Sequence, residues 1–411
     1  MKKYQLITYG CQANKSDSER ITSWLEQSGY RPTERAADLV IINVCSIRQS
    51  AVDRVYGQIN ALRTSGTKIA LTGCLLKSDL KKMKEKVDFI LDIKQLSKWP
   101  QILGSSSKEQ VLTDYFKIPP KSPVPFSSLV PIISGCNNFC TYCVVPYTRG
   151  PEYSRPLEEI MTEIKEAILK GVKEIWLLGQ NVNSYQNKNC NFEQLLEKVE
   201  NLPGDFWIRF LSSHPKEITP QFIKRLKESK KITKYLNLPV QSGDDQVLKR
   251  MNRPYTSSEY EKSILKIVKE IPTLSLSTDV IVGFPGEDKK AFQNTCQLFK
   301  KIKFDMAYVS KYSPRPGTAS FKFKDDVSKI EKERRFRFLT AILEKTAFQK
   351  NKKIVGQEVR VLVQKRSGPN LIGKTEGYKT VKFAGSEQLI GTFVKVKIEK
   401  ALIWGLKGKL K

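Results

Sequence analysis

Three cysteines within eight residues are the side chains of this sequence best placed to do chemistry. Cys136, Cys140 and Cys143 follow the spacing C-x3-C-x2-C, so one short loop can turn all three thiolates toward a common centre. Soft thiolates select zinc or iron–sulfur clusters. Both normally take four ligands, and this loop offers three. Either a fourth residue closes a structural zinc site, or a cluster is held with one iron open to a small molecule.

A second triplet lies in the N-terminal third, where Cys11, Cys45 and Cys74 each come one or two residues after a predicted strand. Parallel strands end at one edge of a sheet, the edge where open α/β sheets bind ligands. The three thiols are therefore expected to lie side by side in a site that is again one ligand short. The alternative is three small buried thiols without a shared role, because free cysteine is often buried. The single histidine, His214, argues against Cys/His zinc sites.

Alternating strand and helix patterns position this second triplet. Strands are predicted at 4–9, 38–44 and 68–72, and helices at 17–27 and 48–62. The strand at 38–44 is almost continuously apolar, as expected for a strand buried on both faces. The alternation indicates βαβ units in an α/β domain with a parallel sheet. Gly10 and Gly73 directly precede two of the cysteines and would ease tight turns there.

The same alternation resumes after a proline-rich connector and positions the first triplet. Strands are predicted at 129–134, 174–178, 207–211, 235–239, 277–283 and 306–310. Helices are predicted at 157–170, 192–200, 220–228, 257–269, 289–301 and 329–349. Six such units suit an incomplete (β/α)6 barrel, whose site lies at the carboxyl ends of the strands.

Polar and glycine residues follow five of these strands, which indicates a pocket on that rim. Each set alone is weak evidence, because glycine and proline also simply turn chains. The candidates for binding a small cofactor are Gly179, Gln180, Gln241, Ser242, Gly283 and Gly286. His214 precedes a proline in a loop, where a structural role is favoured over a proton shuttle. Cys296 is predicted to pack within an amphipathic helix, and Cys190 is assigned no role.

The C-terminal residues predict a small β-barrel with a basic surface. Strands are expected at 358–364, 371–375, 380–383 and 391–398, and from Lys350 on there are fifteen lysines and arginines against four glutamates. Tyr378, Phe383 and Phe393 are interleaved with these lysines. Exposed aromatic rings on basic strands suit RNA, although some of the three must fill the barrel core. The chain thus divides into residues 1–105, a linker at 106–126, a barrel at 127–349 and a β-barrel at 350–411.

Overall composition agrees with a polyanionic partner. The chain has 71 lysines and arginines against 42 acidic residues, a net charge of +29. Such a balance indicates a polyanion such as nucleic acid, or reflects a lysine-rich genome. No apolar run reaches the ~18 residues that span a bilayer, and the start of the chain has no apolar signal region. A cytoplasmic protein is expected, in which cysteines are ligands or free thiols rather than disulfides.

Local motifs add a resemblance to a known family. The loop from Gly135 to Gly150, with Tyr142 between its last two cysteines, closely resembles the cysteine loop of radical S-adenosylmethionine (SAM) enzymes. There the open iron of a [4Fe-4S] cluster chelates SAM. Segments 8–14, 43–48 and 73–74 resemble the N-terminal methylthiotransferase domain, in which three cysteines bind an auxiliary [4Fe-4S] cluster. Segment 373–377 resembles a TRAM domain, a tRNA-binding appendage of the same family.

The chain is thereby identified as a member of the radical-SAM methylthiotransferases. The resemblance implies a catalytic cluster on Cys136, Cys140 and Cys143, an auxiliary cluster on Cys11, Cys45 and Cys74, and SAM contacts from Tyr142 and the six rim residues given above. Segments 143–150, 154–156 and 178–183 are most similar to the enzyme that adds a methylthio group to C2 of N6-isopentenyladenosine at position 37 of tRNA. An electron donor such as flavodoxin or ferredoxin and an unidentified sulfur-delivery protein are implied as partners.

Three alternatives remain open from the sequence. The nearest is the sister methylthiotransferase for N6-threonylcarbamoyladenosine in tRNA. A second is the ribosomal-protein methylthiotransferase, against which the basic C-terminal part argues, because a protein substrate needs no phosphate-binding surface. The third is a non-enzymatic RNA-binding protein that contains structural zinc.

Overall fold

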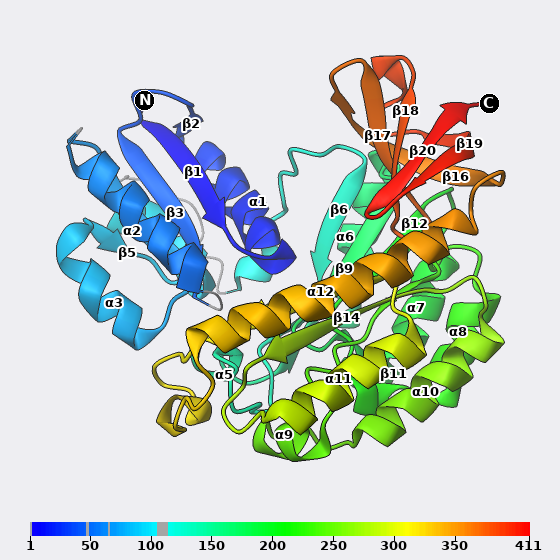
Figure 1. Cartoon of the computed structure of the whole chain (residues 1–411). Helices are drawn as coiled ribbons and strands as arrows, with labels where there is room; N and C mark the ends of the chain where they lie inside the picture. Colours follow the sequence, from blue (N-terminus) through cyan, green and yellow to red (C-terminus); the bar gives the residue numbers. More distant parts are fainter. Residues whose placement is uncertain (1, 47–48, 65, 105–113) are drawn as a thin grey trace.

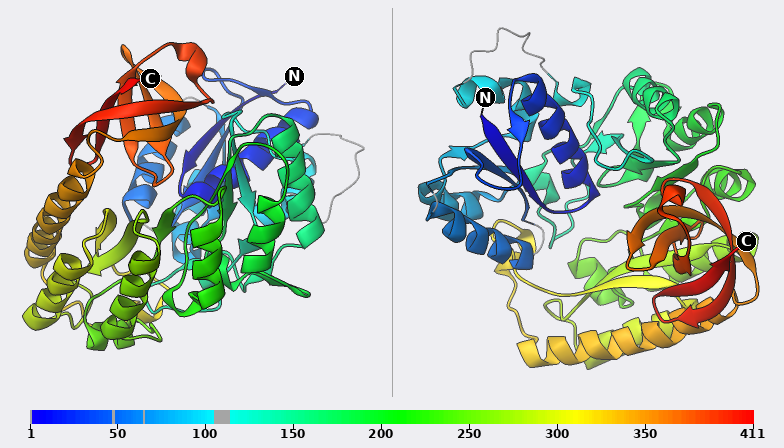
Figure 2. Two further views of the ribbon diagram at one scale, coloured as in Figure 1. Left: turned by 90° about the vertical axis from the view of Figure 1, so that its right-hand side faces the viewer. Right: turned by 90° about the horizontal axis from the view of Figure 1, so that it is seen from above.

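The computed structural model describes the chain except for residues 1, 47–48, 65 and 105–113. Three parts follow one another in the chain: an N-terminal α/β unit, a central βα unit and a small C-terminal barrel (Figure 1). Further views in Figure 2 show the N-terminal unit and the C-terminal barrel both standing against the central unit. A cavity of about 960 Å³ is lined by residues of all three parts, among them Glu19, Trp176 and Lys365. No helix in the described ranges is long and apolar enough to cross a membrane.

The N-terminal unit is built on a parallel sheet with the strand order β2-β1-β3-β4-β5, which confirms the predicted sheet. Its strands are β1 (Lys3–Tyr9), β2 (Arg31–Pro32), β3 (Leu39–Cys45), β4 (Lys68–Cys74) and β5 (Phe89–Ile90). Every residue of β3 is buried, as its apolar run predicts. The helices are α1 (Gln12–Gln27), α2 (Gln49–Arg63), α3 (Lys77–Met83) and the single turn α4 (Trp99–Ile102).

Helix α1 begins at Gln12, earlier than the predicted start at residue 17, with Cys11 as its extended N-cap. Its first turns carry Asn14, Ser16 and Asp17, polar residues that are nonetheless buried. Their polarity hid the buried side of the helix. Asn14 bonds Asn43 within the N-terminal unit, whereas Ser16 and Asp17 bond residues of the central unit. The predicted start of the next helix at Arg48 lies outside the described residues, as does Ile47 of the same motif.

The connector packs onto the N-terminal unit where it is described. Tyr115, Phe116 and Ile118 are buried in the same hydrophobic core as Trp24 and Trp99. The division expected at residues 105 and 106 lies outside the described residues, so it remains a prediction.

Six parallel strands form the central unit in two sheets. One has the order β12-β9-β6 and the other β13-β14-β15. An isolated bridge pairs Ile208 of β12 with Ile232, shortly before β13, and the described order ends at β6 and β15, as in the predicted incomplete barrel. The strands are β6 (Ser127–Pro131), β9 (Glu174–Leu178), β12 (Trp207–Phe210), β13 (Tyr235–Asn237), β14 (Ser275–Val282) and β15 (Met306–Lys311). The first predicted strand is split, because β7 (Ile133–Ser134) turns away to pair with β8 (Tyr153–Ser154).

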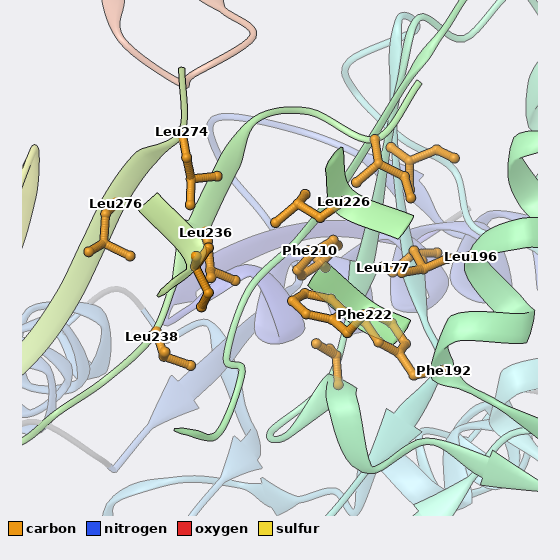
Figure 3. Packing of buried hydrophobic residues seen from close by; sticks show 14 of the residues in the cluster. Leu177, Phe192, Leu196, Phe210, Phe222, Leu226, Leu236, Leu238, Leu274 and Leu276 are labelled. Atoms are coloured by element: carbon orange, nitrogen blue, oxygen red, sulfur yellow. The ribbon is translucent and has the colours of Figure 1, made fainter. Parts of the chain in front are cut away.

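Helices cover the outside of this arc. They are α6 (Leu157–Leu169), α7 (Phe192–Glu200), α8 (Pro220–Glu228), α9 (Asp245–Arg250), α10 (Ser257–Glu270), α11 (Lys289–Ile302) and α12 (Lys329–Lys352), with the single turn α5 (Val145–Thr148) after the cysteine loop. Asn191 and Thr256 begin α7 and α10 with capping boxes, which satisfy the free N–H groups of the first turn. Leu and Phe side chains from strands and helices interlock beneath them, as Figure 3 shows for Leu177, Phe210 and Phe222.

The C-terminal part is a closed barrel with the order β16-β17-β18-β20-β19. Its strands are β16 (Glu358–Ser367), β17 (Asn370–Thr375), β18 (Thr380–Ala384), β19 (Phe393–Leu402) and β20 (Gly405–Leu410). The last of these was not predicted. Its sequence, GLKGKL, contains two lysines and two glycines, and its large apolar side chains are Leu406 in the core and Leu410 packed against it. Closing the barrel nevertheless requires it, because an open edge would leave backbone N–H and C=O groups unpaired.

Two cysteine sites on either side of a domain interface

The loop with Cys136, Cys140 and Cys143 runs from β7 to α5 and lies at the carboxyl end of the central barrel. All three cysteines line one cavity of about 420 Å³. Residues at or just after the ends of several different strands complete the lining, among them Gln180, Ser212, Asn237 and Gln241. A pocket built in this way is the usual location of a site in such barrels. The cysteines were predicted to meet at this rim, and the structure brings them there.

Each of the three sulfur atoms accepts a hydrogen bond. Asn138 Nδ2 lies 3.4 Å from Cys136 Sγ, the Val145 amide N 3.5 Å from Cys143 Sγ, and Arg253 Nη1 3.5 Å from Cys140 Sγ. N–H donors directed at sulfur favour the thiolate form and tune bound metal. Burial acts in the opposite direction and raises the pKa of the Cys143 thiol to about 12. A positively charged metal centre would displace this proton and hold the thiolate.

The loop is fixed from behind by an amide. Gln180 Oε1 accepts a hydrogen bond of 2.7 Å from the Gly135 backbone N–H. Gly135 has a φ of +81°, and a Cβ placed there would lie 2.0 Å from the Pro151 carbonyl oxygen, so only glycine fits. Gln180 therefore orients the start of the cysteine loop in addition to lining the cavity.

The predicted SAM-contact residues separate into two groups. Tyr142, Gln180 and Gln241 are part of the cavity lining. The others, Gly179, Ser242, Gly283 and Gly286, stand in the packed backbone around it. A Cβ on Gly179 would lie 2.2 Å from Ile133, and a Cβ on Gly283 would lie 2.3 Å from Lys332. These glycines allow close packing of the rim, and a direct contact with SAM remains a prediction for all seven residues.

Several lining residues were not predicted from the sequence. Asn237 and Asp279 come from within β13 and β14 and are joined by a hydrogen bond of 3.1 Å. Arg253 follows α9 and is held by Tyr255 Oη at 2.7 Å and by the Pro239 carbonyl at 3.1 Å. The available signal was a polar residue toward the carboxyl end of β13 and a carboxylate within β14, although Ser277 and Thr278 beside Asp279 made that carboxylate less conspicuous. Arg253 stands in a loop after a helix and gave no comparable signal.

His214 also lines the cavity, although its visible role is local. Its Nδ1 accepts a hydrogen bond from the Lys216 amide and so begins the turn Pro215–Glu217. Burial lowers the pKa of His214 to about 3, so the ring is neutral at ordinary pH. Cys190 and Cys296 lie in the hydrophobic core of the central unit, as was predicted for Cys296.

The second triplet gathers at the carboxyl edge of the N-terminal sheet. Cys45 and Cys74 end β3 and β4 as directly paired neighbours in the parallel register. Cys11 is the second residue after β1 and is exposed. Its pKa falls to about 6, mainly because the Cys45 thiol donates a hydrogen bond to it. The three thiols thus share one edge, as the strand pattern predicted. In the described ranges, no group of three or more His, Cys, Asp and Glu side chains that could hold a metal ion was found.

Two buried asparagines support this edge. Asn14 Nδ2 donates to Asn43 Oδ1 at 2.9 Å, and Asn43 Nδ2 donates back to the Asn14 carbonyl at 2.8 Å. Cys11 Sγ lies 3.4 Å from Asn14 Oδ1. Gly73 has a φ of +99°, and a Cβ there would lie 2.4 Å from Asn43 Oδ1. The glycine was expected to ease a turn, and a Cβ there would also lie 2.4 Å from the Val44 carbonyl oxygen, so both the asparagine pair and the neighbouring strand require glycine.

Arg149 connects the two cysteine sites. It follows α5, and its Nε lies 3.0 Å from Cys74 Sγ while its Nη2 lies 2.7 Å from Asp17 Oδ2. Arg20 makes two more bonds across the same interface, to the Glu163 carboxylate at 2.8 and 2.7 Å. The N-terminal unit is therefore held against the central unit through buried arginine–carboxylate pairs.

The aromatic residues predicted for RNA stacking occupy other places in the structure. Phe383 lies in the core of the C-terminal barrel. Tyr378 packs against Trp176 and Tyr235, and Phe393 packs against Trp207. All three are in packing contacts, which corrects the expectation that some present free rings to RNA. Trp404, at the turn between β19 and β20, is 43% exposed and was not singled out from the sequence.

Comparisons with known proteins agree with the three parts. The chain matches the family models Radical SAM superfamily at residues 130–299, Uncharacterized protein family UPF0004 at 3–92 and TRAM domain at 352–411. It is 40% identical to the tRNA-2-methylthio-N(6)-dimethylallyladenosine synthase of Dictyoglomus thermophilum, over 100% of this chain and 99% of the relative. It is 38% identical to the protein of the same name from Fusobacterium nucleatum, over the full length of both chains.

Solved structures show the same fold at low sequence identity. The radical S-adenosylmethionine methyltransferase TsrM from Kitasatospora setae matches with a TM-score of 0.54 and 12% identity, over 78% of this chain and 74% of its own. The cobalamin-dependent S-adenosylmethionine radical enzyme OxsB matches with a TM-score of 0.52 and 11% identity, over 84% of this chain and 56% of its own.

Proposed function

The chain belongs to the family of the tRNA-2-methylthio-N(6)-dimethylallyladenosine synthases, and we propose that its two cysteine triplets share one reaction across the domain interface. The protein is a radical-SAM methylthiotransferase that adds a methylthio group to C2 of N6-isopentenyladenosine at position 37 of tRNA. The observation that supports a joint role for the two triplets is the contact of Arg149 with Cys74, because it joins the second triplet to the loop that bears the first.

The cysteine donor sets suit the family's two [4Fe-4S] clusters by their chemistry, although neither triplet in the described ranges is arranged to hold a single metal ion. Cys136, Cys140 and Cys143 would hold one cluster and leave one iron for SAM, and Cys11, Cys45 and Cys74 would hold the other. N–H donors reach all three sulfurs of the first triplet, and Arg149 reaches Cys74 in the second, as expected around metal-bound thiolates. When bound, the clusters and SAM supply the one-electron chemistry that breaks an unactivated C2–H bond, and the sulfur and methyl group that replace the hydrogen.

The protein's own residues bind and orient. Gln180 fixes the cysteine loop through Gly135, and Arg253 bonds Cys140. We assign SAM contacts to Tyr142, Gln180 and Gln241 in the cavity, with Gly179, Ser242, Gly283 and Gly286 shaping the backbone behind them. His214 stays neutral beside the cavity and adds no charge to it.

Partners follow from charge and chemistry. The C-terminal barrel presents exposed Lys395, Lys397, Lys407 and Lys409 along β19 and β20 and an exposed Trp404 ring in the turn between these strands, which suits the phosphates and unpaired bases of tRNA. An electron donor such as flavodoxin or ferredoxin and a separate sulfur-delivery protein complete the proposal. A cytoplasmic location is part of the proposal, and the tRNA substrate supports it.

Mass spectrometry of tRNA nucleosides from cells with and without the gene tests the function. The 2-methylthio derivative of N6-isopentenyladenosine should disappear in the deletion strain, while N6-isopentenyladenosine accumulates. Loss of the 2-methylthio derivative of threonylcarbamoyladenosine instead would assign the chain to the sister activity. Iron, sulfide and zinc analysis after anaerobic purification separates both from a zinc-containing binding protein, because two cubane clusters require about eight irons per chain.

A further inference from the structure

One arginine joins a cysteine of the N-terminal sheet to the cysteine loop of the central barrel. Arg149 stands six residues after Cys143, with only the single turn α5 between them. Its guanidinium is divided between two partners on the other domain: Nε donates to Cys74 Sγ at 3.0 Å and Nη2 to Asp17 Oδ2 at 2.7 Å. The planar fork of arginine fixes both directions at once, which an ammonium group cannot do.

The three groups lie away from solvent. The side chain of Arg149 is 9% exposed and that of Asp17 is 3% exposed, and Cys74 is buried. Charges in such surroundings are weakly screened, so their influence on a neighbouring centre is larger than at the surface. Asp17 carries the opposite charge, and its attraction to the guanidinium offsets part of the free energy that is lost when the cation leaves water.

We infer that Arg149 is a positioning residue of the auxiliary cluster, which holds Cys74 against the central domain and raises the reduction potential of the cluster bound there. The inference rests on the proposed function, which assigns Cys74 to that cluster. Hydrogen bonds to ligand sulfur and nearby positive charge both stabilise the reduced form, which carries one more electron. Asp17 acts in the opposite direction, since its negative charge opposes reduction.

The test isolates the auxiliary cluster in the full-length chain. Replacing Cys136, Cys140 and Cys143 with alanine removes the other cluster, and anaerobic reconstitution with iron and sulfide should then load about four irons per chain. The midpoint potential is measured by redox titration followed by electron paramagnetic resonance. In this background Arg149→Gln should shift the potential to a more negative value, and Asp17→Asn should shift it to a more positive value.

Two further variants separate electrostatics from domain docking. Arg20→Gln removes an arginine that bonds Ser16 and Glu163 at the same interface, and it should lower the melting temperature while leaving the potential in place. Arg149→Lys keeps the charge without the fork and should give a potential between those of the parent and of Arg149→Gln.

The outcomes are distinct. A background protein that loads no iron would refute the auxiliary site and, with it, this inference. A loaded protein whose potential is the same with Arg149 and with Arg149→Gln would overturn the inference and leave the proposed function standing. A shift of the same sign in Arg149→Gln, Asp17→Asn and Arg20→Gln would show that loosened docking, and not the charge on Arg149, moves the potential.

Discussion

The ring of Tyr378 packs edge-on against Trp176, with ring centroids 5.2 Å apart. Tyr378 belongs to the turn between β17 and β18, and Trp176 lies on β9 of the central barrel. Arg209 lies against both rings and donates 2.8 Å hydrogen bonds to the carbonyls of Thr375 and Glu376. The C-terminal barrel thus inserts a turn into the amino-terminal end of the central barrel, opposite the cysteine loop.

Replacing Tyr378 with alanine should loosen this junction. Removing a well-packed ring typically costs about 3 kcal/mol, so the melting temperature should fall by several degrees. Tyr378→Phe keeps the ring and should retain most of the stability. Differential scanning calorimetry measures both, and equal melting temperatures for the alanine variant and the parent would contradict the packing role.

The buried pair of Arg209 and Glu174, with Nε and Oε1 2.5 Å apart, should behave as a coupled unit. Arg209→Met leaves Glu174 buried without its cation, and breaking a pair in this way costs about 3–5 kcal/mol. The double variant with Glu174→Met removes both charges and should recover much of the loss. Urea unfolding of the single and double variants measures the coupling, and simple additivity would contradict it.

Single cysteine changes should divide the iron content between the two sites. Cys140→Ala should lower iron from about eight to about four per chain and abolish SAM cleavage. Cys45→Ala should also leave about four irons but retain SAM cleavage, while methylthiolation of tRNA is lost. Cys296→Ala serves as the control, since Cys296 packs in the core. Full iron content in Cys45→Ala would remove Cys45 from the auxiliary site.

Binding of tRNA should depend steeply on salt, with each phosphate contact contributing roughly −0.7 to −0.9 to the slope of log K against log salt. Lys407→Gln should weaken binding and make this slope less steep. Trp404→Ala should weaken binding without changing the slope, because base stacking releases no counterions. Filter binding over a salt series distinguishes the two, and unchanged affinity in both variants would exclude this face of the barrel.

The buried ring of His214 should make the fold less stable in mild acid. Its pKa is about 3 in the folded chain and near 6.5 in an unfolded one, so between these values the unfolded state binds the extra proton. Stability is therefore unaffected by this group above about pH 6.5 and decreases as the pH falls toward 3. His214→Asn keeps a cap for Lys216 and removes the titration. Its melting temperature should fall less than that of the parent between pH 7 and pH 5.

The sequence predicts the parallel sheets and both cysteine sites because each follows from a local pattern. Apolar runs of strand length mark strands such as β3 and β9. Cys11, Cys45 and Cys74 stand at or just after the ends of β1, β3 and β4, and the other triplet lies in one short loop. The contacts between domains leave no such pattern. Ser16, Asp17 and Arg20 look like a solvated helix face, and only the structure shows that this face is buried against the central unit.

The same reason explains the error at the C-terminal barrel. Tyr378 and Phe393 alternate with lysines, which in an isolated barrel would place them at the surface. A neighbouring domain covers both rings, and a sequence pattern contains no information about a partner surface that is far away in the chain. Trp404, which is exposed, carries the stronger case for contact with RNA.

The turn around Tyr378 also constrains how the protein is made. Trp176 and Arg209 come much earlier in the chain than Tyr378, so the base of the central barrel stays uncovered during synthesis until this turn has been made. Nascent chains that stall before this turn should expose that base to chaperones and proteases.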